Sequence, residues 1–158
     1  MWFSKKQAVA VPPKAVAAGA ATLPGQVTTK SQGDAAEAVA RAYLVSAGLR
    51  WVASNYRTPG RGGGEIDLIM RTPDGTLVFV EVRQRSKTTH GGAGASISST
   101  KQRRIIFAAR HYLMRFSSLP PCRFDVVLIQ GPSPLPGAVG AAPPITWLRA
   151  AFDASAAF

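Results

Sequence analysis

Three features are scarce in this sequence, and each scarcity excludes a class of protein. There is one cysteine, Cys122, among 158 residues, which excludes an internal disulfide and a cysteine-cluster metal site. We expect Cys122 to be a small buried residue. No apolar run approaches the roughly 20 residues that a membrane-spanning helix requires. Acidic residues number only 8, against 19 lysines and arginines, so the chain is strongly basic.

The first 30 residues are rich in alanine, proline, valine and lysine, without a clear period. Pro12, Pro13 and Lys14 interrupt the segment that would have to form the apolar core of a signal peptide, which argues against secretion. We expect residues 1–30 to form a flexible extension with a transient helix around Lys14–Ala21. The single cysteine is compatible with a reducing compartment, and we expect a cytoplasmic protein.

The charge balance predicts the class of partner. A formal net charge of +11 on 158 residues suggests a polyanionic partner, and nucleic acid, DNA foremost, is the first candidate. The alternative is a basic solvated surface or a structural role like that of a ribosomal protein. The length fits one domain with a hydrophobic core of its own.

Two helices are predicted from apolar spacing. Alanine, tyrosine and leucine recur at helical intervals from Ala36 to Ala47, and Gly48 follows as a stop. The second helix starts at a serine or threonine cap within residues 98–100. Its apolar stripe lies within Ile105–Phe116, and lysine and arginine supply its polar face.

Five strands complete one domain over residues 31–153, with a tail at 154–158. The expected strands are 49–56, 65–71, 76–83, 123–129 and a short edge strand at 145–149. The resulting order is helix, strand, strand, strand, helix, strand, strand. This order predicts an α/β fold in which helices pack against a mixed sheet.

Three of the eight acidic residues, Glu65, Asp67 and Glu81, lie in the most strand-like segments. An ionised carboxylate within an apolar strand is costly unless it is paired, hydrogen-bonded or bound to a cation. Such a conflict between residue type and local pattern is expected at functional sites. The alternative is that Asp67 and Glu81 each pair with one of the many arginines.

The turn between the second and third strands fixes which residues face one another. If the turn is Pro73-Asp74-Gly75, then Asp67 lies directly opposite Glu81, and Glu65 lies opposite Arg83. Opposed Cβ atoms are about 4.5–5.5 Å apart, so two carboxylates there repel unless a hard cation lies between them. A register slipped by one residue would place them on opposite faces.

Two other carboxylates have weaker signals. Glu37 lies in the first turn of the first helix, at the edge of its apolar stripe, and could face the sheet as a third ligand. The alternative is a solvated pairing with Arg41 one turn later. Asp125, in the fourth strand, is interpreted as a structural partner of Arg123 rather than as a metal ligand.

The segments that contain these residues resemble the YraN family, small bacterial proteins of unestablished function. The resemblance covers about residues 31–153 and rests on segments 36–44, 55–57, 64–69, 78–83, 101–104 and 122–127. That family in turn resembles PD-(D/E)XK nucleases, particularly archaeal-type Holliday junction resolvases. The resemblance implies a restriction-endonuclease-like core, Mg²⁺ or Mn²⁺ as cofactor, DNA as partner and a homodimer.

The resemblance also implies roles for single residues. Asp67 and Glu81 match the acidic residues of the nuclease motif, and Glu37 matches the helix glutamate of the resolvase-like members. Together they would hold the metal ion, with Asp67 and Glu81 also counted as catalytic. Lys101 and Arg104 match a basic segment after the core. The expected nucleic-acid contacts are Arg57, Arg61, Arg85, Lys101, Arg103 and Arg104.

Position 83 departs from the nuclease motif, which has lysine where this chain has Arg83. Arginine stays protonated and cannot act as a general base, although it can hold a phosphate or stabilise developing charge. Arg83 is therefore a catalytic candidate of limited scope, and Arg85 or Lys87 could substitute for the lysine.

Three functions are consistent with these observations. The first is metal-dependent hydrolysis of DNA phosphodiesters, with branched DNA as one candidate substrate. The second keeps the fold and the nucleic-acid binding without catalysis. The third is a protein-interaction module that uses the edge strand near Ile145–Leu148. A steep dependence of DNA binding on salt would favour the first two over the third.

Overall fold

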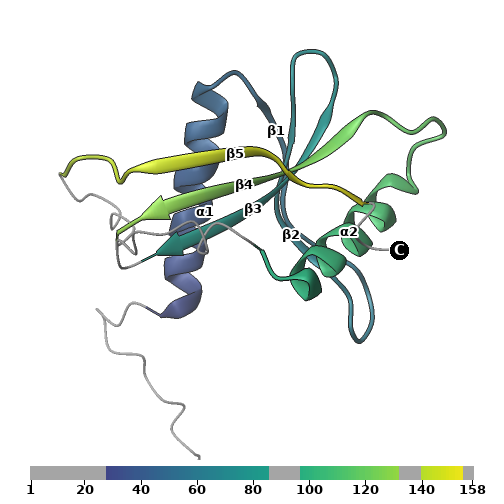
Figure 1. The fold of residues 1–158 in the computed structure, drawn as a ribbon, viewed down its shortest axis with the longest axis horizontal. Coiled ribbons are helices and arrows are strands. Elements are labelled where there is room, and N and C mark those ends of the chain that lie inside the picture. The colour runs from purple at the N-terminus through teal and green to yellow at the C-terminus, as the bar shows by residue number, and fades with distance from the viewer. Residues whose placement is uncertain (1–27, 86–96, 132–139, 155–158) are drawn as a thin grey trace, which may run out of the picture.

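The computed structural model describes residues 28–85, 97–131 and 140–154, which form a five-stranded mixed sheet with two helices packed against it (Figure 1). The predicted extension, including its transient helix, lies almost wholly outside these residues. No helix in the described ranges has the length and apolar character needed to cross a membrane. The elements are α1 (Thr29–Ser46), β1 (Arg50–Arg57), β2 (Glu65–Arg71), β3 (Leu77–Arg85), α2 (Ser99–Leu113), β4 (Cys122–Gln130) and β5 (Ile145–Phe152).

The order of elements is the predicted one, and the arrangement is consistent with a restriction-endonuclease-like fold. Some boundaries differ. Helix α1 begins at Thr29, because the side chain of Thr28 caps it by accepting a hydrogen bond from Ser31 N. Strand β5 continues three residues beyond its predicted end, to Phe152, because its pairing with β4 resumes there after a register shift.

The strands follow their chain order across the sheet, β1-β2-β3-β4-β5. Strands β3 and β4 are parallel, and every other neighbouring pair is antiparallel. Helix α2 lies in the crossover that a parallel pair requires. Central strand β3 starts with four fully buried residues, Leu77–Val80, which explains why its apolar run does not alternate.

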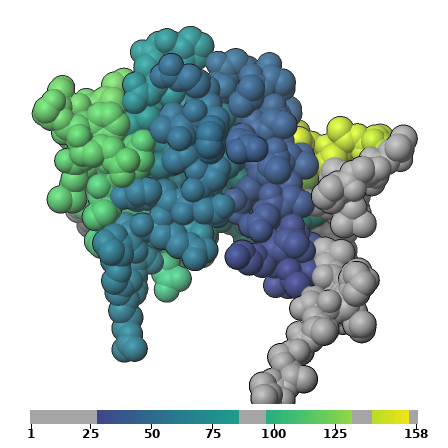
Figure 2. All heavy atoms as spheres, turned by 180° about the vertical axis from the view of Figure 1, so that it is seen from behind, coloured from purple at the N-terminus to yellow at the C-terminus, as the bar shows by residue number. Residues whose placement is uncertain are grey.

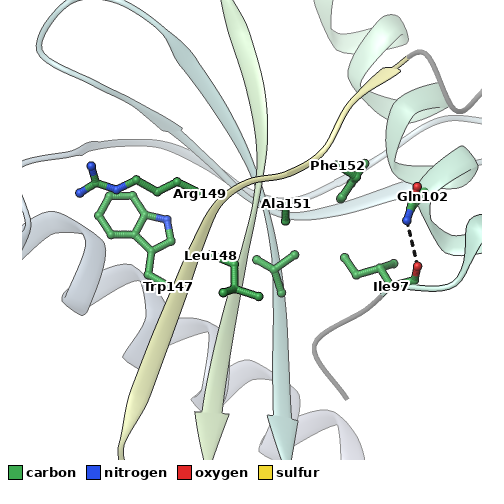
Figure 3. A pocket seen from close by; sticks show the side chains of 8 residues that line it. Ile97, Gln102, Trp147, Leu148, Arg149, Ala151 and Phe152 are labelled. Atoms are coloured by element: carbon green, nitrogen blue, oxygen red, sulfur yellow. Dashed lines mark hydrogen bonds between the residues drawn. The ribbon is translucent and has the colours of Figure 1, made fainter. Parts of the chain in front are cut away.

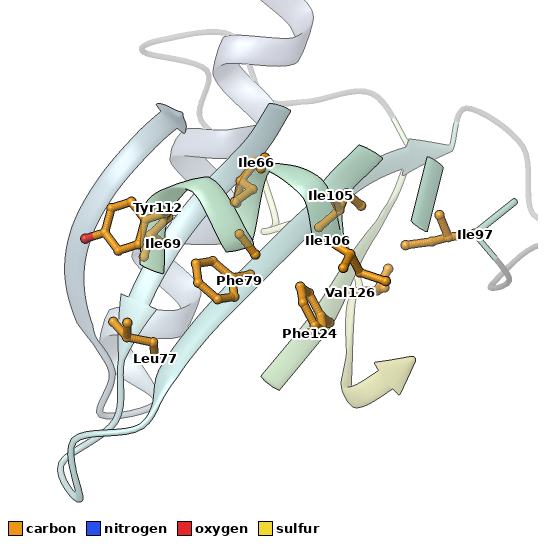
Figure 4. Packing of buried hydrophobic residues seen from close by; sticks show 12 residues of the cluster. Ile66, Ile69, Leu77, Phe79, Ile97, Ile105, Ile106, Tyr112, Phe124 and Val126 are labelled. Carbon is orange, nitrogen blue, oxygen red and sulfur yellow. The ribbon is translucent and has the colours of Figure 1, made fainter. Parts of the chain in front are cut away.

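Two clusters of buried side chains cover the two faces of the sheet. On the α2 face, Phe79 packs between Tyr112 of the helix and Phe124 of β4, with ring centroids 6.0 and 5.6 Å apart (Figure 4). On the α1 face, small residues of the helix, Ala36 and Ala40, are buried against strand residues. The helices are thereby fixed on opposite faces, each close to β2 and β3.

Strands β1 and β2 both become irregular at neighbouring positions. Ile66 and Leu68 would share a face in a regular strand, yet they belong to opposite clusters. The alternation therefore breaks at Asp67. On β1, Asn55 lies between the residues paired with these two and has a φ of +53°, in the left-handed region that asparagine tolerates better than most residues. The bend of both strands positions the site described next.

Candidate active site

The β2–β3 hairpin has the predicted register from its turn as far as the pair Leu68 and Val80. Its turn is closed by a 3.0 Å hydrogen bond from Thr72 N to Thr76 O. The antiparallel pairing then follows the predicted register and ends at Leu68 with Val80. The next residue on β2 is Asp67, at the break in that strand. We call the space between the two strands beyond this last pair the fork.

The carboxylates of Asp67 and Glu81 meet in the fork. Val82 N donates a 2.8 Å hydrogen bond to Asp67 Oδ2. In a continued ladder this N–H would bond to a backbone carbonyl of β2, so the Asp67 side chain takes the place of the strand. The carboxyl groups of Asp67 and Glu81 lie close enough for each to shift the pKa of the other, and two carboxyl groups that close favour sharing one proton.

Burial and mutual repulsion determine the protonation of this pair. Glu81 is 8% exposed, and burial, followed by the charge of Asp67, raises its pKa to about 7. Burial also raises the pKa of Asp67, opposed by the Val82 N–H and by Lys101. Two carboxyl groups this close do not both ionise easily, so the pair holds a proton at a pH where an isolated glutamate has lost it.

A lysine from helix α2 enters the fork, which the sequence did not indicate. Lys101 Nζ lies 3.0 Å from Glu81 Oε2. Lys101 is in the first turn of α2, whose cap Ser98 accepts a 3.3 Å hydrogen bond from Lys101 N. Glu81 Oε2 is buried, and the Lys101 ammonium is the donor that the structure places beside it. Lys101, predicted as a nucleic-acid contact, is thus placed at the carboxylate pair.

Gly64 sets the position of α2 relative to the fork. A methyl group at this position would overlap the backbone carbonyl of Arg104, so strand and helix backbones meet at a distance that only glycine permits. Thr58 fixes Gly64 in turn, through a 2.8 Å hydrogen bond from Gly64 N to Thr58 Oγ1 and a 3.1 Å bond from Thr58 N to Gly64 O. The run of glycines before β2 gives no sign in the sequence of which backbone approaches it.

Glu37 faces a groove of about 880 Å³ between α1 and strands β1 and β2. Figure 2 shows this side of the molecule, with α1 in purple beside the β1–β2 segment in blue. The groove is lined by Lys30, Gly33, Asp34, Glu37, Asn55, Arg57, Glu65 and Asp67. Half of the chain's eight acidic residues therefore gather at one groove of a basic protein.

The environment of Glu37 favours the inward orientation over the solvated alternative. Its Oε2 accepts a 2.8 Å hydrogen bond from Asn55 Nδ2. Burial, and next the charge of Asp67, raises the pKa of Glu37. Arg41, the partner in the alternative, lies over the ring of Trp51, 5.1 Å from its centroid. Sequence reasoning missed Asn55 as part of the site, because its left-handed backbone has no signature in one sequence.

The predicted metal ligands are brought together only in part. Asp67 and Glu81 offer hard carboxylate oxygens close together in a buried position, which fits a divalent cation. The charge of Asp67 raises the pKa of Glu37 across the groove. Yet no three histidine, cysteine, aspartate or glutamate side chains of residues 28–85, 97–131 and 140–154 are grouped as one metal-binding cluster.

The chain matches the family model described as "Uncharacterised protein family UPF0102" over residues 36–129, which include Glu37, Asp67, Glu81 and Lys101. It belongs to the UPF0102 family. This is the YraN family, so the predicted membership is confirmed.

Proteins similar to this one along most of their length bear the same family designation. The UPF0102 protein of Polaromonas naphthalenivorans is 76% identical, with 98% of this chain and 100% of the relative covered. That of Polaromonas sp. (strain JS666) is 68% identical with the same shares covered. That of Albidiferax ferrireducens is 65% identical over 80% of this chain and 91% of the relative. Their names state no reaction.

The other predicted contacts of this UPF0102 protein are spread over several elements. Arg57 forms a 2.8 Å ion pair with Glu65, which the register had placed opposite Arg83. Arg61 is exposed in the loop between β1 and β2, and Arg83 and Arg85 are half-buried in β3. The remaining two, Arg103 and Arg104, are exposed on α2.

Asp125 has the structural role predicted for it. Arg123 Nε donates to both of its oxygens, at 3.0 and 3.2 Å. Trp147 Nε1 and Ala150 N, both from β5, donate at 2.9 Å. The carboxylate therefore joins β4 to the edge strand. Cys122, at the start of β4, is exposed, so its predicted burial is wrong: the residue precedes the buried part of the strand.

A second groove, of about 620 Å³, lies beside edge strand β5 (Figure 3). Its lining is mostly apolar and contains no carboxylate: Ile97, Gln102, Val126, Trp147, Leu148, Arg149, Ala151 and Phe152. Gln102 Nε2 donates to Ile97 O at 2.9 Å, which fixes the chain just before α2. The groove offers apolar contact rather than acid–base or metal chemistry.

Proposed function

We propose that this UPF0102 protein binds nucleic acid and hydrolyses DNA phosphodiester bonds in a metal-dependent reaction, with branched DNA as one candidate substrate. The observation that carries the proposal is the fork. Two carboxylates, Asp67 and Glu81, are held in contact at the point where β2 and β3 separate. One buried oxygen, Glu81 Oε2, has the Lys101 ammonium at 3.0 Å as its partner. The net charge of +11 supports a polyanionic substrate.

A divalent ion is the partner that suits these ligands. Mg²⁺ and Mn²⁺ prefer carboxylate oxygens, and a cation removes the repulsion that raises the pKa of Glu81. Asp67 and Glu81 would hold the ion, with Glu37 as the third ligand from the same groove. A bound divalent ion supplies an activated water and stabilises charge on a phosphodiester.

The protein's own residues prepare the site for that ion. The Val82 N–H orients Asp67 toward the fork, because it fixes one carboxylate oxygen at 2.8 Å. Lys101 brings an ammonium group to Glu81. In the nuclease motif, a lysine at the position of Arg83 would supply that group. A compact ammonium with three donors can hold a water or an oxyanion. Lys101 therefore supports the proposal better than Arg85 does, whereas Lys87 lies outside the described residues.

The test is a nicking assay with supercoiled, single-stranded and branched DNA in Mg²⁺, Mn²⁺ or EDTA. Wild-type protein should cleave at least one substrate in metal and none in EDTA. Glu81→Ala should abolish cleavage while the circular dichroism spectrum is unchanged. Asp74→Asn is the matched control, since Asp74 is an exposed carboxylate at the hairpin turn and its replacement should leave cleavage intact. Equal cleavage by purified Glu81→Ala would refute the assignment.

Nucleic-acid binding without catalysis is the second candidate, and Arg83 is the observation that favours it. An arginine there can hold a phosphate but cannot take a proton. This function predicts no nicking in either metal, together with DNA affinity that falls steeply with salt. The third candidate, protein interaction through β5 and its apolar groove, predicts weak DNA binding with little dependence on salt.

A further inference from the structure

Helix α2 has an outer face that the fork does not use. Its inner face is buried against the sheet through Ile105, Ile106, Ala108, Ala109 and Tyr112. The opposite side is exposed and combines apolar with basic residues. We call these residues the outer face: Arg103, Arg104, Phe107, Arg110 and Met114.

Phe107 lies at the centre of this face. With 3.6 residues per turn, Arg103 and Arg104 lie one turn before it and Arg110 one turn after. The Phe107 side chain is 55% exposed and that of Met114 is 80% exposed. Helix α2 contains no acidic residue, so the charges of Arg103 and Arg104 are not neutralised within the helix. The exposed ring of Phe107 therefore lies beside cationic side chains on the surface of the helix.

We propose that the outer face of α2 binds an unpaired nucleic-acid strand, with Phe107 stacking on a base and Arg103 and Arg104 contacting phosphates. A planar ring is the surface on which an unpaired base stacks, and this stacking is tolerant of sequence. From Arg103 to Met114 the helix rises about 16 Å, enough for two or three nucleotides.

An unpaired strand fits this face better than a duplex or a membrane does. The base faces of a duplex are already stacked, so Phe107 would gain no partner there. A helix that lies in a membrane surface inserts a broad apolar face. In α2 that face is already buried against the sheet, and only two apolar side chains of the helix, Phe107 and Met114, are largely exposed.

The position of the outer face links it to the fork. Lys101, which contacts Glu81, precedes Arg103 by two residues on the same helix. Lys101 and Arg103 point to different sides of the helix, so a strand held on the outer face must pass round the first turn of α2 to enter the fork. This step rests on the proposed function and specifies its substrate: a nucleic acid with an unpaired segment, such as a flap, a gap or a single-stranded branch.

Binding measured in EDTA tests the proposal separately from cleavage. A fluorescein-labelled 15-nucleotide strand and its blunt duplex would be titrated with the full chain, and affinity followed by anisotropy. Phe107→Ala should weaken single-strand binding roughly tenfold or more and duplex binding by less than about twofold. Phe107→Trp should retain single-strand affinity. Leu119→Ala, which removes a 72% exposed apolar side chain outside the helix, is the matched control and should change neither.

The arginines give a second readout in the same assay. Replacing Arg103 and Arg104 together by alanine should weaken binding of both probes. It should also lower the slope of log affinity against log salt by about 1.4 for the single strand, the contribution of two phosphates. Wild-type affinity in Phe107→Ala, or an equal loss on both probes, would overturn the proposal. So would binding to anionic vesicles that competes with the strand and survives in Phe107→Leu. Absence of nicking with these binding results intact would refute only the hydrolytic function.

Discussion

Two buried carboxylates on neighbouring parallel strands, Asp125 on β4 and Glu81 on β3, have opposite environments. Asp125 is 0% exposed and accepts hydrogen bonds from Arg123, Trp147 and Ala150. Glu81 is 8% exposed, lies beside another carboxylate and has only the Lys101 ammonium, at 3.0 Å, as a described partner of its Oε2. A buried polar group with all partners supplied by the fold stabilises the fold. A buried carboxylate with fewer partners and a raised pKa is a candidate for function.

The two carboxylates also differ in where their cations come from. Arg123 lies two residues from Asp125 on the same strand. Lys101 reaches Glu81 from a helix that is positioned by the contact of Gly64 with the Arg104 backbone. The first pairing is local and the second depends on how the domain packs, so substitutions should separate them.

The largest expected effect is on stability, at Asp125. Asp125→Ala should lower the free energy of unfolding by about 3–5 kcal/mol, because it removes one member of a buried ion pair and leaves two N–H groups of β5 unsatisfied. Urea denaturation followed by circular dichroism measures this. A loss below about 1 kcal/mol would show that water replaces the carboxylate easily and that the contrast with Glu81 is overstated.

Glu81→Gln should have the opposite sign. In metal-free buffer at pH 8, the variant should be more stable than wild type by on the order of 3 kcal/mol. The reason is that folding raises the pKa of Glu81 from 4.5 to about 7, so the ionised carboxylate of the wild type destabilises the folded state. The folded state holds the Glu81 proton more tightly than the unfolded state does. Protonation of Glu81 therefore stabilises the folded state fully below about pH 4.5, and this stabilisation is lost as the pH rises through 7.

The pH dependence separates this effect from better packing. The difference in unfolding free energy between wild type and Glu81→Gln should grow between about pH 4.5 and 7 and stay level above that range. The raised pKa values of Asp67 and Glu37 also lower stability as the pH rises, in the wild type and in the variant alike. A difference that does not change with pH would mean that Glu81 titrates normally.

The smallest effect is expected at Gly64. Gly64→Ala should cost about 1–3 kcal/mol, because α2 must move away from β2. That movement should withdraw Lys101 and raise the pKa of Glu81 further, which the same pH analysis would detect. Gly33→Ala is the control: an added methyl meets nothing within 4 Å in helix α1, so stability should hold or improve slightly. An unchanged Glu81 pKa in Gly64→Ala would show that the docking of α2 does not control the charge environment of Glu81.

The parts of the site that could be predicted depend on local sequence. The Pro73-Asp74-Gly75 turn and the apolar strands around it specify the hairpin register, and with it the meeting of Asp67 and Glu81. Turn chemistry and strand period act over a few residues. The same locality allowed Asp125 to be paired with Arg123.

The remaining parts depend on packing between elements distant in the sequence. Lys101 reaches Glu81 because α2 lies against Gly64, and a run of glycines does not reveal which backbone approaches it. Asn55 takes part because β1 bends at a left-handed residue. The extra length of β5 follows from a shift in its pairing with β4. None of these has a period that a single sequence can show.

The β2–β3 hairpin also determines the order in which the site can assemble as the chain folds. Asp67 and Val82 are 15 residues apart, whereas Lys101 belongs to the helix that follows β3 and must dock across the sheet. Contacts that close short loops form before those that close long ones. The two carboxylates should therefore meet before their lysine arrives. A chain that folds at acidic pH, with the shared proton already bound, closes this hairpin without the repulsion that opposes it in alkali.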